Sequence, residues 1–126
     1  NESYSPSTYA LNNWYHVVGV HSNPSSNSFV ELYINGVLVA SDTDSNTSST
    51  TTDDFHIGDY RSTSPGIPFE GNIDEVSIWT KSLSQDEIRY HLCDYNYDDS
   101  NGVRPMDLTL HDTFATNCKL WMRMGD

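Results

Sequence analysis

The chain has 126 residues, of which 36% are hydrophobic, and 18 acidic side chains against 6 Lys and Arg give a formal net charge of −12. This length fits one domain, and the charge argues against nucleic-acid binding because a phosphate backbone would be repelled. No run of residues approaches the ~20 apolar positions that cross a bilayer, so membrane insertion is not expected.

The first part of the chain has the pattern of antiparallel strands. Residues 14–21 are rich in aromatic and β-branched side chains, and residues 29–34 alternate between apolar and polar positions. Both segments are therefore predicted to be strands. Asn35-Gly36 joins the second strand to the apolar run 37–39. This dipeptide predicts a tight hairpin, because both turn residues must take positive φ.

Polar loops and short apolar segments alternate in the middle of the chain. Residues 41–52 are nearly all Ser, Thr, Asp and Asn, and they are predicted to form an exposed loop. Short strands are predicted at 55–58 and 72–79. The adjacent Asp74 and Glu75 interrupt the alternation of the second of these strands, which indicates a bulge or twist at that point.

One helix is expected late in the chain. Ser84 and Glu87 have the spacing of a capping box, in which the serine hydroxyl accepts from the Glu87 amide and the glutamate reaches back. The helix is predicted to end near Leu92, and residues 120–124 are apolar enough for one more strand. Short strands, frequent turns and one short helix predict an all-β protein with an antiparallel sandwich or jelly roll.

Four segments of the sequence, taken together, resemble the concanavalin A-like, laminin G-like jelly-roll family. They are W-Y-H-V-V-G-V (14–20), E-L-Y-I-N-G-V-L-V-A (31–40), F-H-I-G-D (55–59) and F-E-G-N-I-D-E-V-S-I-W-T-K-S-L-S-Q-D-E-I (69–88). Such domains carry several strands before the first of these motifs. The resemblance therefore implies that the N-terminal strands of the sandwich are missing here or are supplied by another segment.

The resemblance also implies a division of the chain. Residues 1–92 would form the C-terminal part of a laminin G-like sandwich, and residues 93–113 would form a linker. Residues 106–126 resemble the connection between tandem repeats of virus, phage and bacterial surface proteins. Residues 114–126 would then begin a following repeat or complete this sandwich. Such a protein is expected outside the cell or on the surface of a particle or cell.

Catalytic residues are not expected. Glycan hydrolases on this fold need two carboxylates ~5–9.5 Å apart across the scissile bond, and the Glu-x-Asp-x-x-Glu motif of the glucanase relatives is absent. Asp74 and Glu75 are neighbours, so on a regular strand they would point to opposite faces. The five histidines have no metal-binding spacing. These observations predict that the chain is not an enzyme.

Asp74 is the candidate metal ligand. In many concanavalin A-like domains, a carboxylate on the strand equivalent to I-D-E-V holds a structural calcium ion, and the resemblance implies that role for Asp74. Calcium takes six to eight oxygen ligands, so one aspartate alone does not make a site. The alternative is that Asp74 accepts hydrogen bonds from a neighbouring loop, and both interpretations stay open.

Tyr60 and Arg61 are the candidate ligand-binding residues, because a sugar site needs an aromatic ring beside polar groups and both residues lie in a predicted loop. Trp14 and Trp79 lie within strand patterns, so they are predicted to belong to the core. The leading hypothesis is a recognition or adhesion module of a larger repeat protein that binds a glycan or cell-surface receptor.

Two other functions compete with this hypothesis. The first is structural assembly of a fibre, tail or shell, in which open strand edges pair with neighbouring repeats or subunits and no glycan is bound. The second is a glucanase-like hydrolase, whose active site would have to lie in the missing half of the sandwich.

Overall fold

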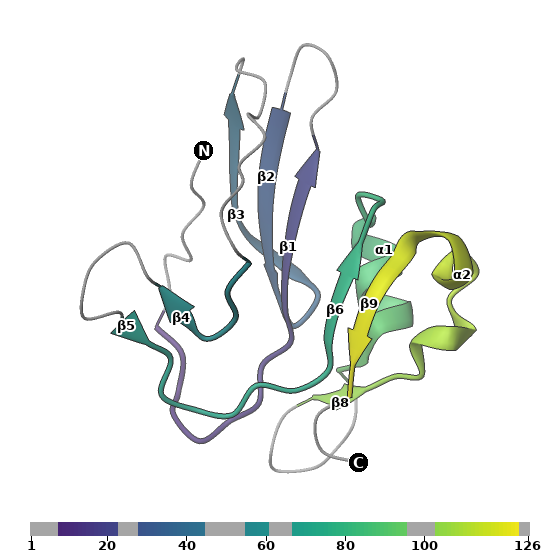
Figure 1. Cartoon of the computed structure of the whole chain (residues 1–126). Helices are drawn as coiled ribbons and strands as arrows, with labels where there is room; N and C mark the ends of the chain where they lie inside the picture. Colours follow the sequence, from purple (N-terminus) through teal and green to yellow (C-terminus); the bar gives the residue numbers. More distant parts are fainter. Residues whose placement is uncertain (1–7, 23–27, 45–54, 61–66, 96–102, 124–126) are drawn as a thin grey trace.

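A computed structural model describes residues 8–22, 28–44, 55–60, 67–95 and 103–123. These residues form short antiparallel strands and a few helical turns (Figure 1). The strands are β1 (Val17–Ser22), β2 (Ser28–Ile34), β3 (Val37–Asp44), β4 (Asp59–Tyr60), β5 (Ile67–Pro68), β6 (Val76–Trp79), β7 (Cys93–Asp94), β8 (Arg104–Pro105) and β9 (Cys118–Met122). The helical segments are α1 (Gln85–Glu87), the π-helical turn η1 (Ile88–Leu92), the 3₁₀ turn η2 (Leu108–Leu110) and α2 (Phe114–Asn117). The chain is thus all-β and antiparallel, as predicted, and forms part of a sandwich.

The largest sheet has the strand order β1-β2-β3, and its central hairpin is the predicted one. Asn35 and Gly36 both take positive φ, 49° and 72°. The Asn35 side chain also accepts from the His16 backbone N–H at 2.9 Å, which holds the turn against the chain entering β1. β3 extends to Asp44, so residues 41–44 of the predicted loop form strand instead, and the rest of that predicted loop lies outside the described residues. Pairing with β2 outweighs the weak strand propensity of the Ser and Asp side chains.

A second pair of strands joins β6 to β9, from Val76 opposite Met122 to Trp79 opposite Cys118. The strand predicted at 72–79 is shorter than expected, because Glu75 takes a left-handed φ of 53° immediately before β6. The irregularity expected at Asp74 and Glu75 is therefore the left-handed backbone conformation of Glu75.

The strand predicted at residues 55–58 does not form. The chain bends there, and Gly58 takes a φ of 75°, so pairing starts only at β4, which is hydrogen-bonded to β5. A left-handed residue cannot continue a strand, and glycine is the residue that tolerates this conformation most easily.

The core lies where the β1-β2-β3 sheet, the β6-β9 pair and the helical segments meet. Its buried members are Val20, Tyr33, Leu83, Ile88, Leu92 and Leu108, and the partly buried Trp79, Phe114 and Trp121 pack against them. The predicted capping box is present at Ser84, and it positions the fully buried Ile88 in the next turn. The core prediction is wrong for Trp14, which is 42% exposed because it precedes β1.

Candidate functional site

An open groove of about 1240 Å³ lies between β1 and β6. Most of its walls come from residues 13–21 and 72–83, together with single residues such as Tyr9 and Phe69. These two stretches lie beside each other in Figure 1, where β6 follows the edge of the sheet next to β1. Folding therefore brings the W-Y-H-V and I-D-E-V segments to opposite walls of one groove.

Several aromatic residues are among those that line this groove. Trp14 and Tyr9 are 42% and 39% exposed. The Tyr9 ring meets the Tyr15 ring edge to face, with 5.2 Å between their centroids. Amide side chains in the same lining belong to Asn13 and Asn72. An exposed aromatic face beside amide groups can pack against the apolar face of a sugar and hydrogen-bond to its hydroxyls.

The carboxylates in the described lining of the groove belong to consecutive residues, Asp74 and Glu75. Asp74 is exposed, and its Oδ1 accepts from the Glu75 backbone N–H at 2.8 Å. The Glu75 carboxylate accepts from Trp121 Nε1 at 2.6 Å and from Arg123 Nε at 3.3 Å. The two groups therefore do not face each other across the groove as the carboxylates of a glycan hydrolase do.

His16 also lines the groove, and it is neutral at physiological pH. Burial lowers the pKa of its imidazole to about 4. Its Nδ1 lies 2.6 Å from the Tyr95 hydroxyl, which in turn donates to the Ile88 carbonyl at 3.2 Å. Burial also raises the pKa of the Tyr95 hydroxyl. A general acid or base works best when its pKa lies near the operating pH, and neither group meets that condition. The contact between His16 and Tyr95 instead joins the chain entering β1 to η1.

The predicted ligand-binding residues are only partly within the described part of the chain. Tyr60 belongs to β4, and its backbone pairs with Ile67 of β5. The Tyr60 side chain and the whole of Arg61 lie outside the described residues. Their role in binding stays a prediction.

Calcium binding at Asp74 also stays a prediction. The structure shows this carboxylate in the groove wall, where it supports the turn at Glu75. Among the described residues, the group of three metal-ligating side chains close enough to share one ion lies elsewhere and consists of Glu87, His111 and Asp112.

Sequence reasoning missed that second group, and it assigned Trp14 to the core when the ring lies in the groove. Glu87 was interpreted only as a helix cap, and His111 only as one of several scattered histidines. The residues are far apart in the chain, so no local spacing connects them. A usable signal for Trp14 was its position at the very start of the apolar run, where a strand has not yet begun.

Antiparallel sheets around a shared core, with a groove lined in part by aromatic residues, are the architecture of part of a β-sandwich. A family model described as the concanavalin A-like lectin/glucanases superfamily matches residues 2–89. The chain belongs to this superfamily, and the match confirms the laminin G-like resemblance.

Laminin G-like domains are generally non-catalytic binding modules and are often extracellular. No curated protein and no solved structure matches the chain. Within the described residues, no helix has both the length and the apolar character of a membrane span.

Proposed function

We propose that this chain is a non-catalytic recognition module that binds glycans in the groove between β1 and β6. The observation that carries the proposal is the exposed ring of Trp14 in a groove that also contains amide side chains. A large aromatic ring that is partly exposed in a concave surface offers an apolar face to a ligand and an indole N–H to a hydrogen-bond acceptor. The superfamily is named for both lectins and glucanases, and both act on carbohydrates, so membership supports a glycan as the ligand.

The described groove offers little for catalysis. Its carboxylates come from adjacent residues. The Glu75 carboxylate accepts hydrogen bonds from Trp121 and Arg123. The imidazole of His16 is neutral and faces Tyr95. These groups support binding without turnover, and the family's frequent extracellular location supports a place outside the cell.

Calcium belongs to this proposal as a structural ion at Asp74. The exposed carboxylate lies in the groove wall, beside the left-handed turn at Glu75. An ion there would stabilise the turn and the adjoining aromatic segment. Since calcium takes six to eight oxygens, the remaining ligands would be backbone carbonyls and water.

A glycan array with the full chain, run with calcium and again with a chelator, tests the proposal. The expected result is binding to a defined glycan that Trp14→Ala removes and Tyr90→Ala preserves. Tyr90 is the matched control, because its ring is 61% exposed and lies outside the groove lining. Loss of binding in the chelator would support the ion at Asp74. Absence of binding in both conditions by a folded chain would refute the glycan proposal.

The edges of the main sheet favour a second candidate function, which is assembly by strand pairing. In the part of the chain that the structure describes, β1 and β3 each pair as strands with β2 alone. Val17 on β1 and Val37 on β3 are 59% and 58% exposed. Unpaired edge strands are templates for pairing with another chain. Concentration-dependent association in sedimentation velocity, together with a silent glycan array, would support assembly instead of glycan binding.

A further inference from the structure

The charged side chains of the groove indicate which class of glycan it can accept. In the described lining, the acidic residues are Asp74 and Glu75, and Lys81 is the one lysine or arginine. The lining also contains His21 and His16, and the imidazole of His16 is neutral at physiological pH. Sugars that carry carboxylate or sulfate groups are recognised chiefly through Arg and Lys side chains, which pair with the anion. Among the side chains of this groove, recognition of such a sugar therefore depends on Lys81.

The ammonium of Lys81 already has a carboxylate partner. It pairs with Oε1 of Glu87, a residue of α1 that is not part of the described groove lining. Burial acts to raise the pKa of Glu87, but hydrogen bonds from Lys81 and Ser84 outweigh that effect and lower the pKa to about 2. Glu87 is therefore ionised at neutral pH, and an acidic sugar would have to compete with it for Lys81.

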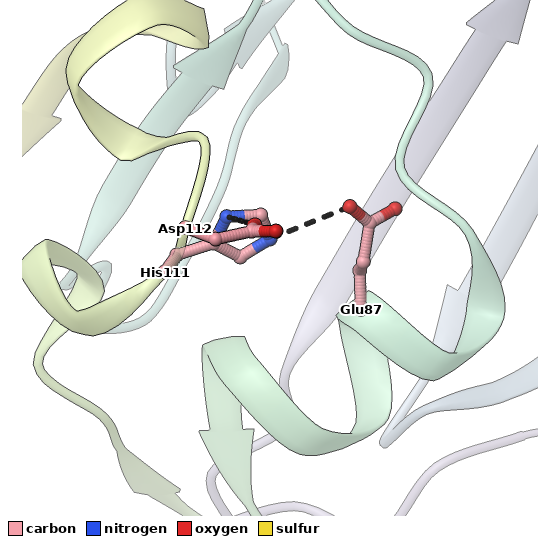
Figure 2. A group of neighbouring side chains, drawn as sticks. All are labelled: Glu87, His111 and Asp112. Atoms are coloured by element: carbon pink, nitrogen blue, oxygen red, sulfur yellow. Dashed lines mark ion pairs between the residues drawn. The ribbon is translucent and has the colours of Figure 1, made fainter.

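Glu87 is fixed in this position by contacts outside the groove. Its Oε2 accepts from the Ser84 backbone N–H at 2.8 Å and from the Ser84 hydroxyl at 2.9 Å, next to the start of α1. Figure 2 shows the carboxylate directed at the imidazole of His111, whose Nε2 lies 3.7 Å from Oε1. The Thr113 backbone N–H donates to His111 Nδ1, so the imidazole proton is on Nε2 and faces the carboxylate. The cation that this group of side chains holds is thus the Lys81 ammonium.

The other charges beside the groove disfavour anions as well. Asp74 is exposed in the groove wall, and Glu75 pairs with Arg123. Counted with Glu87, these three carboxylates outnumber the two cations that pair with them, and the whole chain has a net charge of −12. A surface with this imbalance lowers the local concentration of anionic ligands. A carboxylate in the wall can still accept hydrogen bonds from the hydroxyls of an uncharged sugar.

We infer that the groove binds glycans without acidic groups, and that Glu87 excludes acidic glycans by holding the one Lys or Arg cation of the described lining. This inference rests on the glycan function proposed above and specifies its ligand class. Glu87 is a positioning residue, because it lies outside the groove lining and its effect is transmitted through Lys81. Uncharged hexoses and N-acetylhexosamines have the apolar faces and hydroxyls that aromatic rings and amide groups recognise.

A glycan array of matched pairs, probed with the full chain, tests the inference. Each uncharged glycan, such as N-acetyllactosamine, is printed beside its sulfated form, and hexagalacturonate is printed beside its uncharged methyl ester. The assay is run at pH 8, where imidazoles in general are uncharged, with calcium and again with a chelator. In whichever condition the uncharged members bind, the acidic members should bind at least ~10-fold more weakly. The difference should narrow when NaCl is raised from ~0.05 M to ~0.5 M, because salt screens exposed charges.

Glu87→Gln is the decisive variant. Glutamine can still serve in a capping box, but it releases the Lys81 ammonium. Binding of the acidic members should therefore rise several-fold relative to the uncharged members. Adding Lys81→Met to the same chain removes the released cation and should restore the wild-type ratio. A merely structural role for Glu87 would lower both affinities together, and that result would overturn its assignment as a positioning residue.

Asn72→Lys provides a second measurement that leaves α1 intact, because it adds a cation directly to the groove wall. Leu110→Lys is the matched control, since Leu110 is 77% exposed, lies outside the lining and receives the same added charge. Acidic glycans should gain affinity in the first variant and not in the second. Equal binding of both members of the pairs by the wild type, or a ratio unchanged in Glu87→Gln and Asn72→Lys, would overturn the inference and leave the glycan function standing. An array on which no glycan binds would refute the glycan function itself, and the inference with it.

Discussion

Trp121 contacts Glu75 across 46 residues of sequence, through an indole Nε1–H that donates to Oε2 at 2.6 Å. Arg123 donates to the other oxygen of the same carboxylate, and its guanidinium lies over the Trp121 ring at 5.3 Å from the centroid. Glu75 holds a left-handed φ of 53°, which residues other than glycine and asparagine rarely adopt. The contact therefore ties β9 to the strained residue immediately before β6.

Trp121→Phe removes this donor and keeps an aromatic ring. We expect the free energy of unfolding to fall by ~1.5–3 kcal/mol, the range for hydrogen bonds to charged groups. A double-mutant cycle with Glu75→Gln should give a coupling of ~0.5–3 kcal/mol in urea unfolding. Trp14→Phe, at an exposed site, should stay within ~0.5 kcal/mol of the wild type. Additive losses in the cycle would contradict a direct interaction.

Ile88 is the centre of the core, with 0% of its surface exposed. Ile88→Ala should lower the free energy of unfolding by ~2–5 kcal/mol and Ile88→Val by ~0.5–1.5 kcal/mol, because each leaves a cavity of different size. Leu110→Ala is the control, since Leu110 is 77% exposed and should cost less than ~0.5 kcal/mol. Equal effects at the two positions in urea unfolding would show that Ile88 is not in the core.

Gly36 is expected to tolerate no side chain. Its φ is 72°, and a Cβ there would lie 2.7 Å from Arg89 Cγ and 2.8 Å from a ring carbon of Tyr95. Gly36→Ala should therefore lower stability by more than the ~1–2 kcal/mol of left-handed strain alone. Gly19 has open space around its Cβ position, so Gly19→Ala in β1 should be neutral or slightly stabilising. Thermal unfolding of the two variants, followed by circular dichroism, compares them directly.

The pKa of His16 predicts a loss of stability in acid. Burial lowers it from 6.5 to about 4, so below pH 6.5 the unfolded chain binds a proton that the folded chain does not. Stability contributed by the neutral imidazole is present above pH 6.5 and is lost as the pH falls toward 4, by up to ~3 kcal/mol.

Urea unfolding at pH 7.5 and pH 4.5 measures this effect. His16→Gln should reduce the difference between the two pH values, because the variant lacks the titrating group. Leu110→Ala, at an exposed position without a titrating group, should leave the difference unchanged. An unaltered pH dependence in His16→Gln would assign the acid sensitivity to other groups.

Much of the candidate site could not be predicted from the sequence, although the two segments that line it were identified. The W-Y-H-V and I-D-E-V motifs were identified, yet nothing in either indicates that they form facing walls of a groove. Trp14 was assigned to the core because its neighbours resemble a strand, but strand pairing starts three residues later, at Val17. A propensity pattern describes a segment, whereas burial depends on what packs against it.

By itself, the sequence determined the features that depend on neighbouring residues. The Asn35-Gly36 turn and the capping box at Ser84 formed as predicted, because φ preferences and short-range hydrogen bonds are encoded within four residues. The tertiary structure alone decided the pairing of β6 with β9 and the approach of His111 to Glu87. Those contacts join distant segments, and only burial of the shared core brings them together.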